Sequence, residues 1–224
     1  MTCLSRMTTL FVGLTLLGGC AYKGGDIGDP IHRKFHWASF VAGDDIAANC
    51  SADLPDRVRL VYNAVWGEQV RIYEWDSLRR NLRVRVIGAG DLRDIRPMDD
   101  PVAAWRAAEA SVPLDAAAYD GLTAALADSG GFGPPAVGVE LPSHSFFWAA
   151  ATCRQGKFTF TGWAYPSKAF DAARFPAALF ALDPGRDGVH PVGVVPLDVM
   201  REYDKNRGAI NDFTFKVGAN GMVR

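Results

Sequence analysis

Apolar residues recur at every second position in several segments of the chain, which is the pattern of a half-buried β-strand. Segment 35–41 (FHWASFV) has this pattern and is predicted to be the first strand. Segments 69–76 (QVRIYEWD) and 81–88 (NLRVRVIG) alternate on either side of a short connection, which predicts a β-hairpin. The same pattern predicts two further hairpins and a closing strand, in segments 145–153 with 157–164, 176–182 with 189–194, and 211–217.

Helical spacing of apolar residues marks three other segments. Asp53 is a candidate N-cap, and Pro55 lies in the first turn of a helix that we expect to end near Gly67. Two Ala-rich helices are expected in the middle of the chain, over 101–111 after Asp99-Asp100 and over 116–129 after Asp115. These elements predict an α+β fold, a mainly antiparallel sheet of hairpins with an N-terminal helix and a central pair of Ala-rich helices, with the helices on one side of the sheet.

Composition excludes several classes of protein. Of the 224 residues, 49% are hydrophobic and 22% are charged, which is too apolar for a disordered chain. The 24 Lys and Arg residues balance 25 Asp and Glu residues, so the chain lacks the excess of positive charge that nucleic-acid binding requires. We therefore expect one compact domain and no nucleic-acid partner.

The N-terminus has the order of a secretory signal. Arg6 is its charged residue, and the apolar run 10–17 that follows is shorter than the roughly 20 residues that a membrane span needs. This stretch is therefore predicted to be a cleaved signal peptide and not a membrane-spanning helix.

The end of this signal, Leu17-Gly18-Gly19-Cys20, resembles the lipobox of bacterial lipoproteins. In that family the cysteine thiol receives a diacylglycerol, the preceding peptide bond is cut and the new amino group is usually acylated. The resemblance implies a signal peptide over 1–19 and attachment to a membrane through lipid on Cys20. Ala21, where many lipoproteins retained in the inner membrane have Asp, implies the periplasmic face of the outer membrane. The alternative is an ordinary secretory signal with an incidental cysteine.

Residues 20–34 contain glycine, proline and mixed charges, and we interpret them as the lipidated cysteine followed by a tether. The rest of the chain, 35–224, is then expected to form a single periplasmic domain.

Two cysteines remain for the domain, because Cys3 leaves with the signal and Cys20 carries lipid. Export to an oxidising compartment predicts a disulfide between Cys50 and Cys153, closing a loop of about a hundred residues. The alternative is that Cys153 is a nucleophile, as in cell-wall peptidases. Those enzymes carry an Asp-Cys-Ser-Gly type of motif, whereas the sequence here is Ala-Thr-Cys-Arg.

Motifs of catalysis and metal binding are mostly missing from the sequence, which lacks HExxH, CxxC, GxSxG and a Walker loop. We predict no catalytic residue, metal or cofactor. Ser143 and His144, just before an aromatic strand, and His190 are the residue types that a hydrolase would use. Because adjacent residues on a strand point to opposite faces, Ser143 and His144 are more simply interpreted as a strand-entry turn.

The first hairpin carries the best candidate for a binding surface. Its alternation predicts one apolar face and one face with arginines and aromatic rings, where a phosphate or carboxylate could be held against a ring. The candidate residues are Arg71, Tyr73, Trp75, Arg83 and Arg85. The alternatives are a solvated sheet face and a face covered by the Ala-rich helices.

Together these features lead to one functional hypothesis and two alternatives. The hypothesis is an outer-membrane lipoprotein, anchored through Cys20, whose periplasmic domain binds an envelope protein or an anionic glycan or lipid. One alternative is an envelope hydrolase with a site near Ser143 and His144. The other is a purely structural domain.

Overall fold

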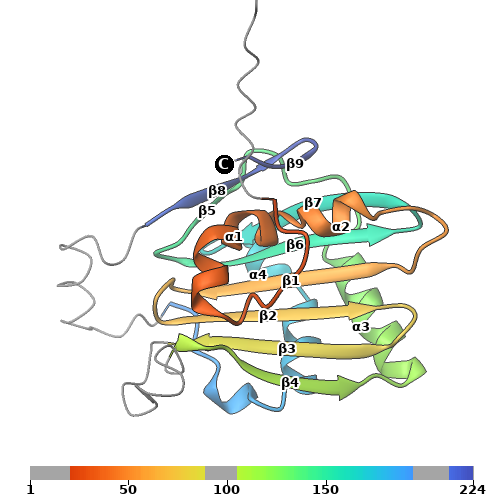
Figure 1. The fold of residues 1–224 in the computed structure, drawn as a ribbon, viewed down its shortest axis with the longest axis horizontal. Coiled ribbons are helices and arrows are strands. Elements are labelled where there is room, and N and C mark those ends of the chain that lie inside the picture. The colour runs from red at the N-terminus through yellow and green to blue at the C-terminus, as the bar shows by residue number, and fades with distance from the viewer. Residues whose placement is uncertain (1–20, 89–104, 194–211, 224) are drawn as a thin grey trace, which may run out of the picture.

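An antiparallel sheet of six strands forms the centre of the protein in the computed structural model, which describes residues 21–88, 105–193 and 212–223 (Figure 1). The strand order is β4-β3-β2-β1-β6-β7, and a second sheet has the order β5-β8-β9. The α+β fold class is therefore confirmed. The strands are β1 (Arg57–Ala64), β2 (Gln69–Asp76), β3 (Asn81–Gly88), β4 (Ala108–Pro113), β5 (Glu140–Pro142), β6 (Phe146–Arg154), β7 (Lys157–Ala164), β8 (Thr214–Gly218) and β9 (Gly221–Val223).

Helices cover both faces of the main sheet, so the prediction that they lie on one side is wrong (Figure 1). The helical elements are α1 (Pro30–Ala42), α2 (Asp44–Ala48), α3 (Ala116–Asp128), α4 (Lys168–Ala172), α5 (Phe175–Leu182) and the 3₁₀ turn η3 (Arg186–Gly188). Residues of α1, α2 and the small sheet share one apolar core with the main sheet, and residues of α3 and α5 share the other. Two cores on one sheet explain why its central strands are buried on both faces.

Strand β1 occupies the region where a helix was expected up to Gly67, so that prediction is wrong. Seven of its eight positions are buried, because β1 lies between β2 and β6 and is covered on both faces. A central strand can therefore carry apolar residues on both faces, and the subset Val58, Val61 and Tyr62 matches helical spacing by coincidence.

Helix α1 replaces the strand expected over 35–41 and begins inside the expected tether, so both predictions are corrected here. Asp29 caps the helix by accepting from the backbone N–H groups of Ile31 and His32, and Pro30 follows at the first helical position. The helix ends at Gly43, whose φ of 73° is in the left-handed region. Tyr22 and Ile27 are also buried, so the described part of the expected tether packs against the domain.

The middle of the chain holds one of the two expected Ala-rich helices. Helix α3 is confirmed, with Asp115 accepting from the N–H of Ala118. The expected helix over 101–111 is wrong in its described part, because residues from Ala108 onward form the edge strand β4, while 101–104 lie outside the described residues. The described helix in contact with α3 is α5, where a strand was expected.

The first two predicted hairpins are confirmed as β2–β3 and β6–β7, and the closing strand is confirmed over its described part as β8. The third hairpin is wrong, since its first half is α5 and residues 189–193 form no strand. The disulfide between Cys50 and Cys153 is confirmed, with a Cα–Cα distance of 5.5 Å, and it joins the loop after α2 to the end of β6.

Candidate functional site

The register of the β2–β3 hairpin separates the five predicted binding residues. The pairs are Ile72 with Arg85 and Glu74 with Arg83. The connection 77–80 has an even number of residues, so odd-numbered residues of β2 share a face with even-numbered residues of β3. Arg71, Tyr73 and Trp75 therefore lie on the face covered by α3 and α5, and Arg83 and Arg85 lie on the opposite face. The single Arg and aromatic face expected from the sequence does not exist.

The face of the hairpin that carries Arg71 is part of the protein core. Nη1 of Arg71 lies 2.6 Å from Oδ2 of Asp183, and these side chains are 3% and 1% exposed. The Tyr73 hydroxyl donates to the same carboxylate oxygen at 2.7 Å, and Arg71 donates to the carbonyl oxygen of Gly185. Burial, and then Asp183, raise the pKa of Tyr73, so its hydroxyl stays a donor. These contacts fasten the end of α5 to the sheet and leave no group for a ligand.

The opposite face carries alternating acidic and basic side chains, which we call the charge row. Its consecutive contacts are Asp45 Oδ1 to Arg59 Nη1 (2.7 Å), Arg59 Nε to Glu74 Oε1 (2.8 Å), Glu74 Oε2 to Arg85 Nη1 (2.8 Å), Arg85 Nε to Glu109 Oε2 (3.2 Å) and Glu109 Oε2 to Arg83 Nη2 (2.7 Å). Arg59 and Arg85 are almost fully buried, whereas the side chains of Arg83 and Glu109 are 46% and 43% exposed. The row thus runs from the interior to the surface across β1, β2, β3 and β4.

The buried end of the charge row is held in its ionised form. Burial alone would lower the pKa of Arg59, but Glu74 and Asp45 outweigh it and raise that pKa above its ordinary value. Burial alone would raise the pKa of the Asp45 carboxyl, but its bonds to Arg59 and the charge of Arg57 hold it below the ordinary value. The hydrogen bonds of Arg83 lower the pKa of Glu109 in the same way.

This arrangement predicts acid sensitivity. A carboxyl whose pKa is lowered by folding stabilises the native state above its unfolded pKa, and this contribution is lost as the pH falls through the native pKa. We expect the free energy of unfolding of the wild-type protein to decline below about pH 4. The free energy of unfolding of the Asp45→Asn variant should decline less steeply over that range. Urea unfolding between neutral pH and about pH 3 measures both curves. Equal slopes for the two proteins would contradict this role of Asp45.

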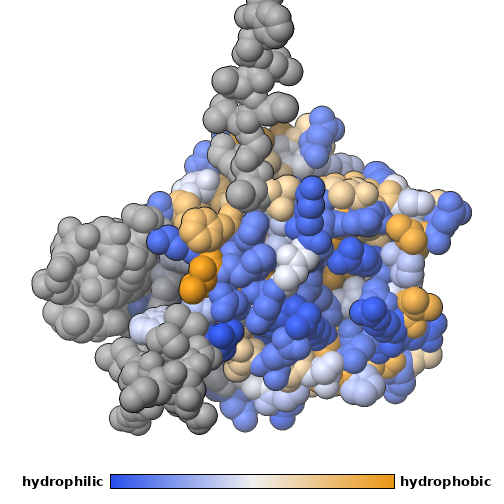
Figure 2. All heavy atoms as spheres, in the orientation of Figure 1, coloured by the Kyte–Doolittle hydropathy of each residue, from blue (hydrophilic) through white to orange (hydrophobic). Residues whose placement is uncertain are grey.

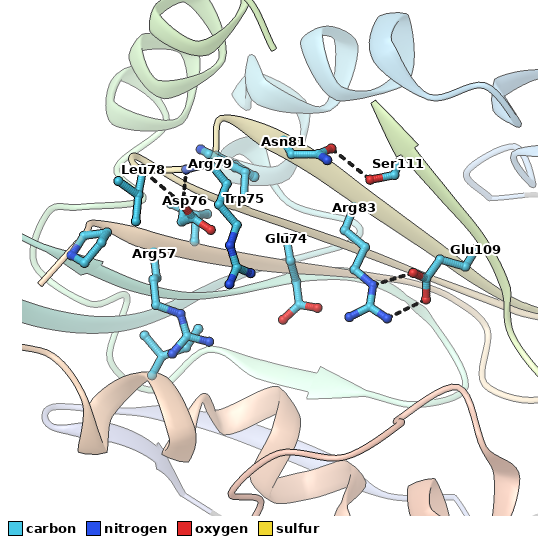
Figure 3. Close-up of a pocket in the computed structure, with 13 residues that line it drawn as sticks. Arg57, Glu74, Trp75, Asp76, Leu78, Arg79, Asn81, Arg83, Glu109 and Ser111 are labelled. Atoms are coloured by element: carbon cyan, nitrogen blue, oxygen red, sulfur yellow. Dashed lines mark hydrogen bonds and ion pairs between the residues drawn. The ribbon is translucent and has the colours of Figure 1, made fainter. Parts of the chain in front are cut away.

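A hollow of about 570 Å³ lies over the exposed end of the charge row and the β2–β3 turn (Figure 3). The guanidinium groups of Arg57, Arg79 and Arg83 point into it from three elements, on the same side as the Glu74 carboxylate (Figure 3). Its lining residues are Ile46, Pro55, Arg57, Val58, Glu74, Trp75, Asp76, Leu78, Arg79, Asn81, Arg83, Glu109 and Ser111.

The arginines of the hollow differ in how far their N–H groups are satisfied. Arg83 makes two parallel hydrogen bonds to Glu109, and Arg57 makes one contact to Asp45, at 3.2 Å. Arg79 is exposed, and within the described part of the chain its guanidinium has no hydrogen bond or ion pair. Arg57 and Arg79 thus have donors left for a carboxylate or phosphate group.

The candidate hydrolase residues do not form a catalytic pair. Ser143 is fully buried, and its Oγ accepts from the backbone N–H of Phe213 at 2.9 Å. His144 is exposed, and both residues lie in the turn between β5 and β6, as the strand-entry interpretation predicts. The backbone N–H of His190 donates to Gln69, and its carbonyl oxygen accepts from the hydroxyl of Tyr62. The Ser143 hydroxyl donates to Oδ1 of Asp212 at 3.5 Å, and within the described residues neither His144 nor His190 is hydrogen-bonded to this hydroxyl.

Several residues of the site escaped the sequence analysis. The alternation of segment 69–76 does not single out Glu74, Glu109 falls in the expected helix over 101–111, and the expected helix over 55–67 conceals Arg57 and Arg59. The signal that could have revealed them is the Arg-x-Arg spacing that recurs in β1 and β3. The expected tether over 20–34 and strand over 35–41 separate His32 from His36, whereas on α1 the two are four residues apart with ring centroids 4.3 Å apart. The described residues contain no group of three or more potential metal ligands.

No helix within the described ranges is long and apolar enough to cross a membrane. The chain matches no protein-family model and no curated protein. The function is therefore inferred from the N-terminal sequence and from the geometry of the hollow.

Proposed function

We propose that the protein is an outer-membrane lipoprotein, anchored through lipid on Cys20, whose periplasmic domain is a binding or envelope-assembly module. The Leu17-Gly18-Gly19-Cys20 sequence supports the anchor. The disulfide between Cys50 and Cys153 supports export, because disulfides persist in oxidising compartments.

The observation that carries the binding role is the hollow in which Arg57 and Arg79 present unused N–H groups. An arginine guanidinium recognises carboxylate and phosphate through paired hydrogen bonds. The ligand therefore carries such an anionic group, as the glycans and lipids of the envelope do. The hydrolase alternative draws no support from Ser143, whose hydroxyl is buried and bonded to the backbone.

Replacing Cys20 tests the anchor. With Cys20→Ala, the thiol that would accept the diacylglycerol is gone, so we expect the protein to leave the membrane fraction and appear in the soluble fraction or as an unprocessed precursor. Cell fractionation followed by immunoblotting measures this. The control is Cys3→Ala, which lies inside the signal peptide and is expected to keep wild-type distribution. Membrane attachment of Cys20→Ala equal to wild type would rule out this anchor.

Removing the free guanidinium groups tests the binding role. For Arg57→Gln combined with Arg79→Gln, we expect affinity for purified muropeptides or lipopolysaccharide to fall at least about tenfold, since a hydrogen bond to a charged group contributes about 1.5–3 kcal/mol. Isothermal titration measures the affinity.

The matched control for this pair is Arg174→Gln, because the Arg174 side chain is 75% exposed and lies outside the hollow. Equal affinities of the double variant and this control would contradict binding in the hollow. Hydrolysis of the same muropeptides that is abolished by His144→Ala would instead favour the hydrolase alternative.

A further inference from the structure

The first described residues are fixed to helix α1. The backbone N–H of Tyr22 donates to Oγ of Ser39 at 2.6 Å, and the Tyr22 hydroxyl donates to the carbonyl oxygen of Gly25 at 2.8 Å. The Tyr22 ring packs edge-on against Phe40 with 5.0 Å between centroids, and the residue is 7% exposed. Tyr22 is therefore part of the folded domain, not of a tether.

This attachment limits how far the domain can lie from a lipid on Cys20. Consecutive Cα atoms are about 3.8 Å apart, so the chain between Cys20 and Tyr22 spans at most about 8 Å. A membrane that holds the lipid must then lie close to α1. A long flexible linker would allow the domain to tumble freely, but the single residue Ala21 between Cys20 and Tyr22 does not.

The side of α1 that faces away from the core has the composition of a membrane-contacting helix. Ile31 and Phe35 are 60% and 67% exposed, and their spacing of four places them on the same side of the helix. Figure 2 shows hydrophobic side chains on the surface over α1. Lys23 and Lys34 are exposed close by in the sequence, whereas the nearby carboxylate of Asp29 is paired with Arg106. Apolar side chains flanked by lysines are typical of helices that lie in a membrane interface.

We propose that α1 lies on the surface of a phospholipid bilayer, with Ile31 and Phe35 inserted among the head groups and Lys23 and Lys34 at the lipid phosphates. This inference rests on the proposed lipid at Cys20. The occupant is a bilayer and not a protein partner, because two exposed apolar side chains are far less than the roughly 800 Å² per partner of a stable protein interface. The contact holds the domain in one orientation on the membrane.

A nitroxide probe tests this orientation. The mature lipidated protein is labelled at Phe35→Cys, which supplies the one free thiol because Cys50 and Cys153 form a disulfide, and is placed in phosphatidylethanolamine–phosphatidylglycerol vesicles. The control is Ala124→Cys, exposed on α3 on the opposite face of the main sheet. At position 35 we expect the collision rate with oxygen to exceed that with a water-soluble nickel chelate, and at position 124 we expect the reverse.

The possible outcomes separate this inference from the proposed function. If mass spectrometry of the same sample finds lipid on Cys20 and both probes are equally accessible to the nickel chelate, the orientation is overturned while the anchor stands. If Cys20 carries no lipid, the anchor is overturned and the orientation falls with it. If the protein carries lipid on Cys20, and the probe at position 35 but not the probe at position 124 collides more often with oxygen than with the nickel chelate, the result supports both the anchor and the orientation.

Discussion

Asp183→Ala is expected to lower the free energy of unfolding by about 3–5 kcal/mol, because it leaves the Arg71 charge buried without its partner. The same substitution removes the acceptor of the Tyr73 hydroxyl, which is also fully buried. Both groups lie on β2 in the middle of the sheet, where water cannot replace the lost oxygen. Urea unfolding at neutral pH measures the loss.

Asp187→Ala is the matched control, since Asp187 lies four residues away and its side chain is fully exposed. We expect its unfolding curve to coincide with that of the wild type. A loss below about 1 kcal/mol for Asp183→Ala would mean that Arg71 finds water or another acceptor, and the structural role assigned to this ion pair would be wrong.

Removing the disulfide has the second large expected effect. Cys50 and Cys153 are separated by 103 residues, and a crosslink of this length restricts the unfolded chain strongly. For the double variant Cys50→Ala with Cys153→Ala, the chain-entropy model predicts a loss of about 3–5 kcal/mol. Guanidinium unfolding under non-reducing conditions measures it.

Reduction of the wild-type protein is the independent check of this effect. In dithiothreitol, the wild-type protein is expected to have the same lower guanidinium midpoint as the double variant. Dithiothreitol is expected to leave the midpoint of the double variant unchanged. An identical midpoint for wild type with and without dithiothreitol would show that the two thiols are not paired in the native protein.

The sequence predicted best those elements whose signals are local. Helix α3 follows from a capping aspartate, Asp115, and a helical apolar pattern, and neither depends on the rest of the fold. The β2–β3 and β6–β7 hairpins follow from alternation on both sides of short turns. Helix α1 is hard to predict because its cap, Asp29, lies in a stretch with the glycine, proline and mixed charge of a tether, and the large residues of 35–41 also fit a spacing of two.

What the sequence could not predict depends on tertiary placement. Whether the apolar run of β1 is a helix or a strand depends on its position between β2 and β6, which only the assembled sheet determines. The candidate binding face failed for a related reason, because one residue more or less in the connection 77–80 would change which side chains of β2 and β3 share a face. The disulfide is predictable, because the expected export to an oxidising compartment and the cysteine count leave one pair.

The intact mass of the mature protein tests the proposed anchor most directly. We expect a chain that begins at Cys20 and carries a diacylglycerol on its thiol, with a further acyl chain on its amino group, together with a mass lower by two hydrogens for the Cys50–Cys153 disulfide. The predicted result is thus a lipid-modified N-terminal cysteine in material extracted from the outer membrane. An unmodified Cys20, or a mature chain that begins at any other residue, would contradict the proposal.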